Sequence, residues 1–68
     1  MKLSTRNQIR GTVTAVTLGA VIATIRVDIG GGNVVTSTIT NDAVADLGLA
    51  VGDVVVVLIK SSDVMIGK

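Results

Sequence analysis

The stretch Ile9-Arg10-Gly11-Thr12-Val13-Thr14-Ala15 decides the fold class, because small or apolar residues alternate in it with polar ones. A period of two residues is typical of a β-strand with one face on a core and the other in water. The alternation returns in residues 21–29, and residues 34–40 are rich in the Val and Thr that strands favour. The sequence therefore predicts an all-β protein.

Glycine-containing segments separate these strands. Residues 17–20 are expected to turn, with Gly19 able to adopt a positive φ. Gly30-Gly31-Gly32-Asn33 could be a phosphate-binding loop or a hairpin turn. The Gly-Lys-Ser/Thr of a phosphate-binding loop is missing and no helix is predicted to follow, so we interpret the segment as a hairpin turn.

Residues 41–48 are the only segment that predicts a helix. Asn41 is a suitable N-cap, although Thr40 before it could also cap the helix, and Gly48 is a natural C-terminal stop. Val44 and Leu47 are three residues apart and are expected to face the core.

The apolar run Val54-Val55-Val56-Val57-Leu58-Ile59 predicts a strand without alternation. Such strands are normally covered on both faces, which indicates a partner subunit over the outer face. After a turn at residues 61–63, Val64-Met65-Ile66 predicts a short last strand. Five strands with one short helix between strands 3 and 4 match an OB-like Greek-key barrel, and an SH3-like barrel is the competing architecture.

Composition restricts the size and stability of the fold. The 68 residues are expected to form one domain over 1–68, without Phe, Trp or Tyr as large core fillers and without Cys for disulfides or metal binding. Yet 49% of the residues are hydrophobic, more than one small barrel can easily cover. Self-association into a homo-oligomer is the expected remedy.

Charge and residue content argue against several functions. A net charge of +1 without aromatic stacking residues disfavours a nucleic-acid-binding barrel. Without His or Cys, an enzyme would need a Ser–Lys pair such as Ser4 or Ser61 with Lys60, for which no motif is present, so we predict no enzyme and no catalytic residue. No signal peptide is visible and no run is long enough to span a bilayer, so we expect no membrane contact and, by default, a cytoplasmic location.

The candidate site is a set of hydrogen-bond donors at the two ends of the chain. Ser4, Thr5 and Arg6 stand at the entry to the first strand, and Lys60 and Ser61 follow the apolar strand. Arg and Lys donate but cannot accept, so the two stretches together would suit a small, fully deprotonated anion. The plainer interpretation is that both cations are solvated charges at strand ends and that the hydroxyls belong to turns.

The ordered set of motifs along the chain resembles the molbindin family, the Mop domains that bind molybdate and tungstate. The residues that carry the resemblance are Ser4-Thr5-Arg6-Asn7-Gln8 with Gly11, Gly19-Ala20-Val21, Thr36-Ser37 with Ile39-Thr40, Leu47-Gly48-Leu49 with Gly52, and Ile59-Lys60-Ser61 with Val64-Met65. A free-standing copy resembles the small storage-type molbindins, which assemble as trimers of dimers.

The resemblance implies oxyanion sites between the subunits of a hexamer. One chain would supply Ser4, Thr5, Arg6, Lys60 and Ser61, and its neighbour would supply Thr40 and the residue three positions later. Many members have Ser there, whereas this chain has Ala43, which could offer only its backbone N–H. The implied ligand is molybdate or tungstate, with molybdenum bound only as the oxyanion and no catalytic cofactor, for molybdenum storage or homeostasis. The alternative function is a structural or nucleic-acid-binding OB-type barrel.

Overall fold

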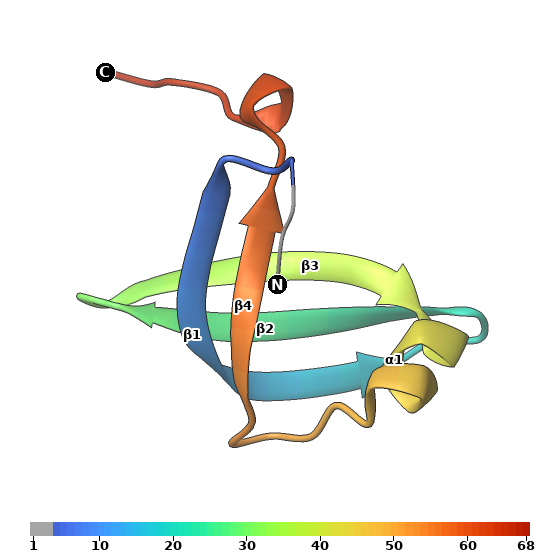
Figure 1. Cartoon of the computed structure of the whole chain (residues 1–68). Coiled ribbons are helices and arrows are strands. Elements are labelled where there is room, and N and C mark those ends of the chain that lie inside the picture. Colours follow the sequence, from blue (N-terminus) through green and yellow to red (C-terminus); the bar gives the residue numbers. More distant parts are fainter. Residues whose placement is uncertain (1–3) are drawn as a thin grey trace.

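The computed structural model describes residues 4–68, and its elements are shown in Figure 1. In chain order they are β1 (Asn7–Leu18), β2 (Ile22–Gly30), β3 (Asn33–Thr40), α1 (Asn41–Leu47), β4 (Val54–Ile59) and the 3-10 turn η1 (Ser61–Asp63). The all-β class and the position of the short helix between the third and fourth strands are confirmed.

The strands form one antiparallel sheet in the order β3-β2-β1-β4. The long β1 pairs with β4 through its first half and with β2 through its second half, and the register shifts between Val13 and Ala15. Figure 1 shows β1 bending where it passes from one partner to the other. β3 and β4 are the edges of this sheet, so a closed barrel is not confirmed within one chain.

The predicted fifth strand, residues 64–66, is absent from the described chain. These residues have no regular structure, and the Met65 and Ile66 side chains are 94% and 90% exposed. A strand needs a neighbour for its backbone hydrogen bonds, and here the chain leaves the sheet after η1 without finding one. Apolar, strand-favouring residues were therefore not sufficient to define a strand.

Two turns illustrate different uses of glycine. The hairpin interpretation of the glycine run is confirmed, since Gly30 pairs with Asn33 and Gly31 and Gly32 have φ of 63° and 79°. The positive φ expected for Gly19 is wrong, because this residue is not among the glycines with positive φ. A Cβ at Gly19 would instead lie 2.5 Å from the carbonyl oxygen of Ile22, so the turn requires a close backbone approach.

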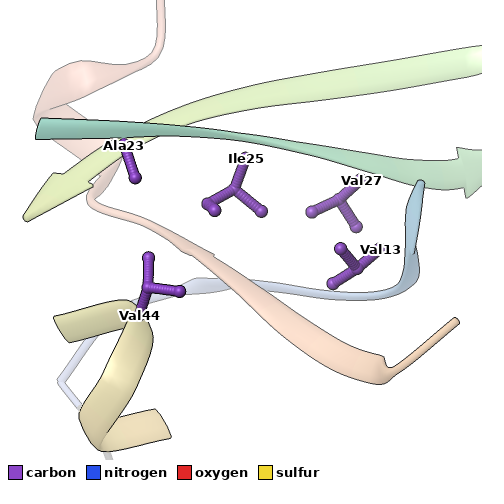
Figure 2. Close-up of a cluster of buried hydrophobic side chains, with 5 residues drawn as sticks. All are labelled: Val13, Ala23, Ile25, Val27 and Val44. Atoms are coloured by element: carbon purple, nitrogen blue, oxygen red, sulfur yellow. The ribbon is translucent and has the colours of Figure 1, made fainter. Parts of the chain in front are cut away.

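The core is small and lies between the two halves of the bent sheet. Its buried members, shown in Figure 2, are Val13, Ala23, Ile25, Val27 and Val44. The β2 side chains project toward Val13 of β1 and toward Val44 of α1. Val44 is the one buried residue of the helix.

Two details of α1 differ from the prediction. Thr40, not Asn41, is the N-cap, because the Thr40 Oγ1 accepts a hydrogen bond from the Ala43 N–H at 3.1 Å. Leu47 is 69% exposed and does not face the core. Leu49, just beyond the helix, packs against the core in its place, with its N–H donating to the Val44 carbonyl.

Burial in β4 alternates although its sequence does not. Val55, Val57 and Ile59 are half-buried, whereas Val54, Val56 and Leu58 are exposed by 69%, 43% and 44%. Within one chain the outer face of this strand is therefore uncovered. Over residues 4–68, no helix combines the length and the apolar character needed to cross a bilayer.

Candidate functional site

The pairing of β1 with β4 places residues 4–6 and residues 60–61 at the same end of the sheet. Asn7 is opposite Ile59 in the last pair of this ladder. Because the strands are antiparallel, Arg6 and Lys60 are the next residues beyond that pair, at the same end of the sheet. We call Ser4, Thr5, Arg6, Lys60 and Ser61 the donor end, and Figure 1 shows the two segments that form it side by side.

The first segment of the donor end surrounds a shallow concavity. It is lined by Ser4, Thr5, Arg6 and Gln8. The Gln8 Nε2 donates to the Thr5 carbonyl oxygen at 3.0 Å, and this bond ties the segment to the start of β1. Gln8 was not predicted as a site residue, although the period of two places it on the same side as Arg6.

The second segment of the donor end is the turn that follows β4. Lys60 has an extended backbone, with φ −61° and ψ 137°, and its carbonyl oxygen accepts the Asp63 N–H at 2.9 Å. Ser61 opens the 3-10 turn, and both side chains are exposed. The turn thus leaves an ammonium and a hydroxyl accessible beside the first segment.

Thr40 and Ala43 lie elsewhere in the same chain, at a place that we call the cap end. Thr40 is opposite Ile22, and the start of β2 in turn pairs with the end of β1. Figure 1 shows α1 at that end, away from the start of β1 and the end of β4. The structure therefore places five of the seven predicted site residues beyond the same end of the β1–β4 ladder and leaves Thr40 and Ala43 apart from them.

The hydrogen bond between Thr40 and Ala43 determines what the cap end can donate. A hydroxyl has one donor and two acceptor positions, so accepting the Ala43 N–H leaves the Thr40 O–H free to donate. The Ala43 N–H is already used in this bond. A contact between the Ala43 N–H and an anion stays a prediction. It would require this N–H to be shared between the Thr40 Oγ1 and an anion oxygen, or to leave the Oγ1 for the anion.

The donor end has the chemistry of an oxyanion site. An Arg fork, a Lys ammonium and hydroxyls can compensate two negative charges and donate to several oxygens at once. Over the described residues, no group of three His, Cys, Asp or Glu side chains is placed to hold a metal ion.

Comparisons with known proteins show the family of the chain. The family model of the TOBE domain matches residues 3–66. A probable molybdenum-pterin-binding protein of Haemophilus influenzae is 46% identical over 67 residues, which cover 98% of this chain and 97% of the relative. The chain belongs to the molbindin family of TOBE domains.

Solved molbindin structures have the same fold as this chain. The molybdate-binding protein of Sporomusa ovata superposes with a TM-score of 0.93 at 40% identity, and the superposition covers 100% of each chain. The cytoplasmic molybdate-binding protein ModG, with molybdate bound, superposes with a TM-score of 0.90 at 42% identity over 96% of this chain and 46% of its own. One relative of this molbindin chain, ModG, therefore carries molybdate on the same fold.

Proposed function

We propose that the protein binds molybdate and tungstate as intact oxyanions, for molybdenum storage or homeostasis. The observation that carries the proposal is the juxtaposition of Arg6 with Lys60 at the end of the β1–β4 ladder, with hydroxyls on either side. The molybdate-binding proteins among the relatives support the choice of anion. The protein is proposed to act by binding alone, without catalysis.

We further propose that each site is completed by a second chain. The donor end of one subunit would receive Thr40 and Ala43 from the cap end of its neighbour, because a single chain holds these two groups apart. The assembly would be a hexamer, a trimer of dimers. In it, residues 64–66 would find a strand neighbour and complete the five-stranded barrel.

Hydrogen-bond character explains the proposed selectivity. Molybdate carries no proton near neutral pH, whereas phosphate is partly protonated and needs an acceptor for that proton. Arg6 and Lys60 can only donate, so a phosphate hydroxyl would have to use a Ser or Thr oxygen as its acceptor or face a cationic donor, and either arrangement weakens phosphate binding. Tungstate has the same charge and nearly the same shape as molybdate and should bind with similar affinity.

The place of the protein in the cell is part of the same proposal. We infer a single domain over residues 1–68 that works in the cytoplasm, as ModG is described to do. Neither a nucleic acid nor a membrane is part of the proposed function.

Calorimetric titration of the purified protein tests this function directly. Molybdate and tungstate should bind with similar affinity, and phosphate and single-stranded DNA far more weakly or not at all. Phosphate binding as tight as molybdate binding would refute the selectivity proposed for this site. Binding of DNA without binding of molybdate would favour the alternative, a nucleic-acid-binding barrel.

A further inference from the structure

The side chain of Asn7 connects the two segments of the donor end. Its Nδ2 donates to the carbonyl oxygen of Ile59 at 3.0 Å, across 52 residues of sequence. Asn7 directly follows Arg6, and Ile59 directly precedes Lys60. One side-chain hydrogen bond thus joins the residue next to one cation of the donor end to the residue next to the other.

This bond lies where the backbone ladder stops. Asn7 and Ile59 form the last pair between β1 and β4, so Arg6 and Lys60 have no ladder partners to fix their separation. Strand ends open easily when no further contact ties them down. The bond is partly buried, which shields it from competition with water.

The residue type at this position also needs an explanation. Asn is depleted in strands, yet it opens β1 here. Its side-chain amide donates a hydrogen bond to a carbonyl group at the end of the ladder. Val and Ile favour strands but have no side-chain donor and could not make this bond. The bond, not strand propensity, accounts for Asn at this place.

We propose that Asn7 is a positioning residue of the oxyanion site, which sets the separation of Arg6 and Lys60 without touching the anion. This inference rests on the proposed function. If the bond is lost, the two segments can separate, and the anion must then order them when it binds, which lowers affinity. Replacing Asn7 should therefore lower the affinity for molybdate even when the variant is folded and assembled.

The test compares Asn7→Ala and Asn7→Val with Asn33→Ala. Asn33 is a matched control, since its Nδ2 also donates to a backbone carbonyl, that of Gly30 at 3.2 Å, but in the β2–β3 hairpin. Asn7→Val removes the donor while retaining a strong strand former, so it should fold even where Asn7→Ala is unstable. Molybdate affinity is measured by calorimetry, with the fold and the oligomer of each variant checked by circular dichroism and light scattering.

We expect both Asn7 variants to bind molybdate roughly 5- to 20-fold more weakly, as expected for loss of one organising hydrogen bond. Asn33→Ala should bind within about twofold of wild type, whatever its melting temperature, because its bond lies outside the donor end. A purely structural role would lower the melting temperature of the Asn7 variants and leave their affinity at 25 °C unchanged, and that result would overturn the proposal. Arg6→Ala and Lys60→Ala are titrated in parallel. If both of these also bind molybdate as wild type does, the oxyanion site itself is wrong. If they bind weakly while the Asn7 variants bind as wild type, only the role of Asn7 is rejected.

Discussion

Arg6 and Lys60 are separated by nearly the whole chain, and the function proposed here depends on their being neighbours. Each is exposed and lies at the end of a different strand. Alone, each would be an ordinary solvated charge. Together they can neutralise a dianion, because an Arg fork and a compact ammonium reach different oxygens of the same ligand.

Removing either cation should therefore weaken molybdate binding. A charge-assisted hydrogen bond contributes roughly 1.5–3 kcal/mol, so Arg6→Ala or Lys60→Ala should raise the dissociation constant by about 10- to 100-fold. Arg26→Ala is the control, because Arg26 lies on the exposed face of β2 opposite Thr36. Calorimetric titration measures all three, and wild-type affinity in both site variants would show that the proposed site is wrong.

Thr40 has one observed role and one proposed role, which two measurements on the same variant can separate. Its Oγ1 caps α1, and its O–H is free to donate to an anion. Thr40→Ala should destabilise the protein by about 1 kcal/mol through the lost cap, and should weaken molybdate binding by about fivefold through the lost donor. Thr40→Ser retains both groups and should resemble wild type. A lower melting temperature of Thr40→Ala with unchanged affinity would mean that Thr40 is only a cap.

At the scale of elements, β1 determines where the site forms, because it is shared between two partners. Its first half pairs with β4 and so creates the donor end. Its second half pairs with β2, which in turn holds β3 and the cap end. The bend between the halves requires a close approach, and Gly11 is the residue that permits it.

Gly11→Ala tests this role of β1. A Cβ at Gly11 would lie 2.5 Å from Val27 Cγ1 and 2.7 Å from the Asp28 carbonyl oxygen. The backbone oxygen cannot rotate away, so we expect a destabilisation of roughly 1–3 kcal/mol and a fall in melting temperature of roughly 5–15 °C. Gly67→Ala is the control, since a Cβ added at Gly67 would meet nothing within 4 Å. Equal melting temperatures for the two variants would show that β1 does not need glycine here.

The elements that the sequence predicts well are those whose signals are local. Alternation and hairpin glycines located the first three strands, and the apolar run located β4 from Val54 to Ile59. The same local signals located the helix but did not decide between Thr40 and Asn41 as its cap, since both residue types are suitable.

What local patterns could not predict depends on a distant or absent neighbour. Residues 64–66 have strand-favouring side chains, but a strand exists only where another backbone accepts its hydrogen bonds. Leu47 has helical spacing from Val44, but Leu49 takes the core position instead. For the site, residue types suggested the donors, and the spacing of two residues from Arg6 could have added Gln8. The bond from Asn7 to Ile59 became visible only in three dimensions.

The whole molecule exposes more surface than its mass requires. A monomeric protein of this mass is expected to expose roughly 4,000 Å², whereas this chain exposes 5179 Å². Its radius of gyration is 12.5 Å, compared with about 11 Å expected for a compact chain of this length. An apolar groove runs along β4 toward Ile39 of β3, and the outward-facing side chains of β4 are apolar as well. These features support the proposed oligomer.

A charge on the outer face of β4 should therefore disrupt the assembly. Val56 and Leu58 are 43% and 44% exposed in the single chain, and burying a lysine against a partner without a counter-charge is strongly unfavourable. We expect light scattering at micromolar concentration to give six times 6.9 kDa for wild type and a smaller mass for Val56→Lys or Leu58→Lys. Thr36→Lys, on the exposed face of β3, is the control and should leave the mass unchanged.

Because Thr40 of a neighbour is proposed to complete each site, the dissociated variants should also bind molybdate more weakly, although their own donor ends are intact. A stable wild-type monomer would contradict the oligomer, and full molybdate affinity in a dissociated variant would contradict sites shared between chains.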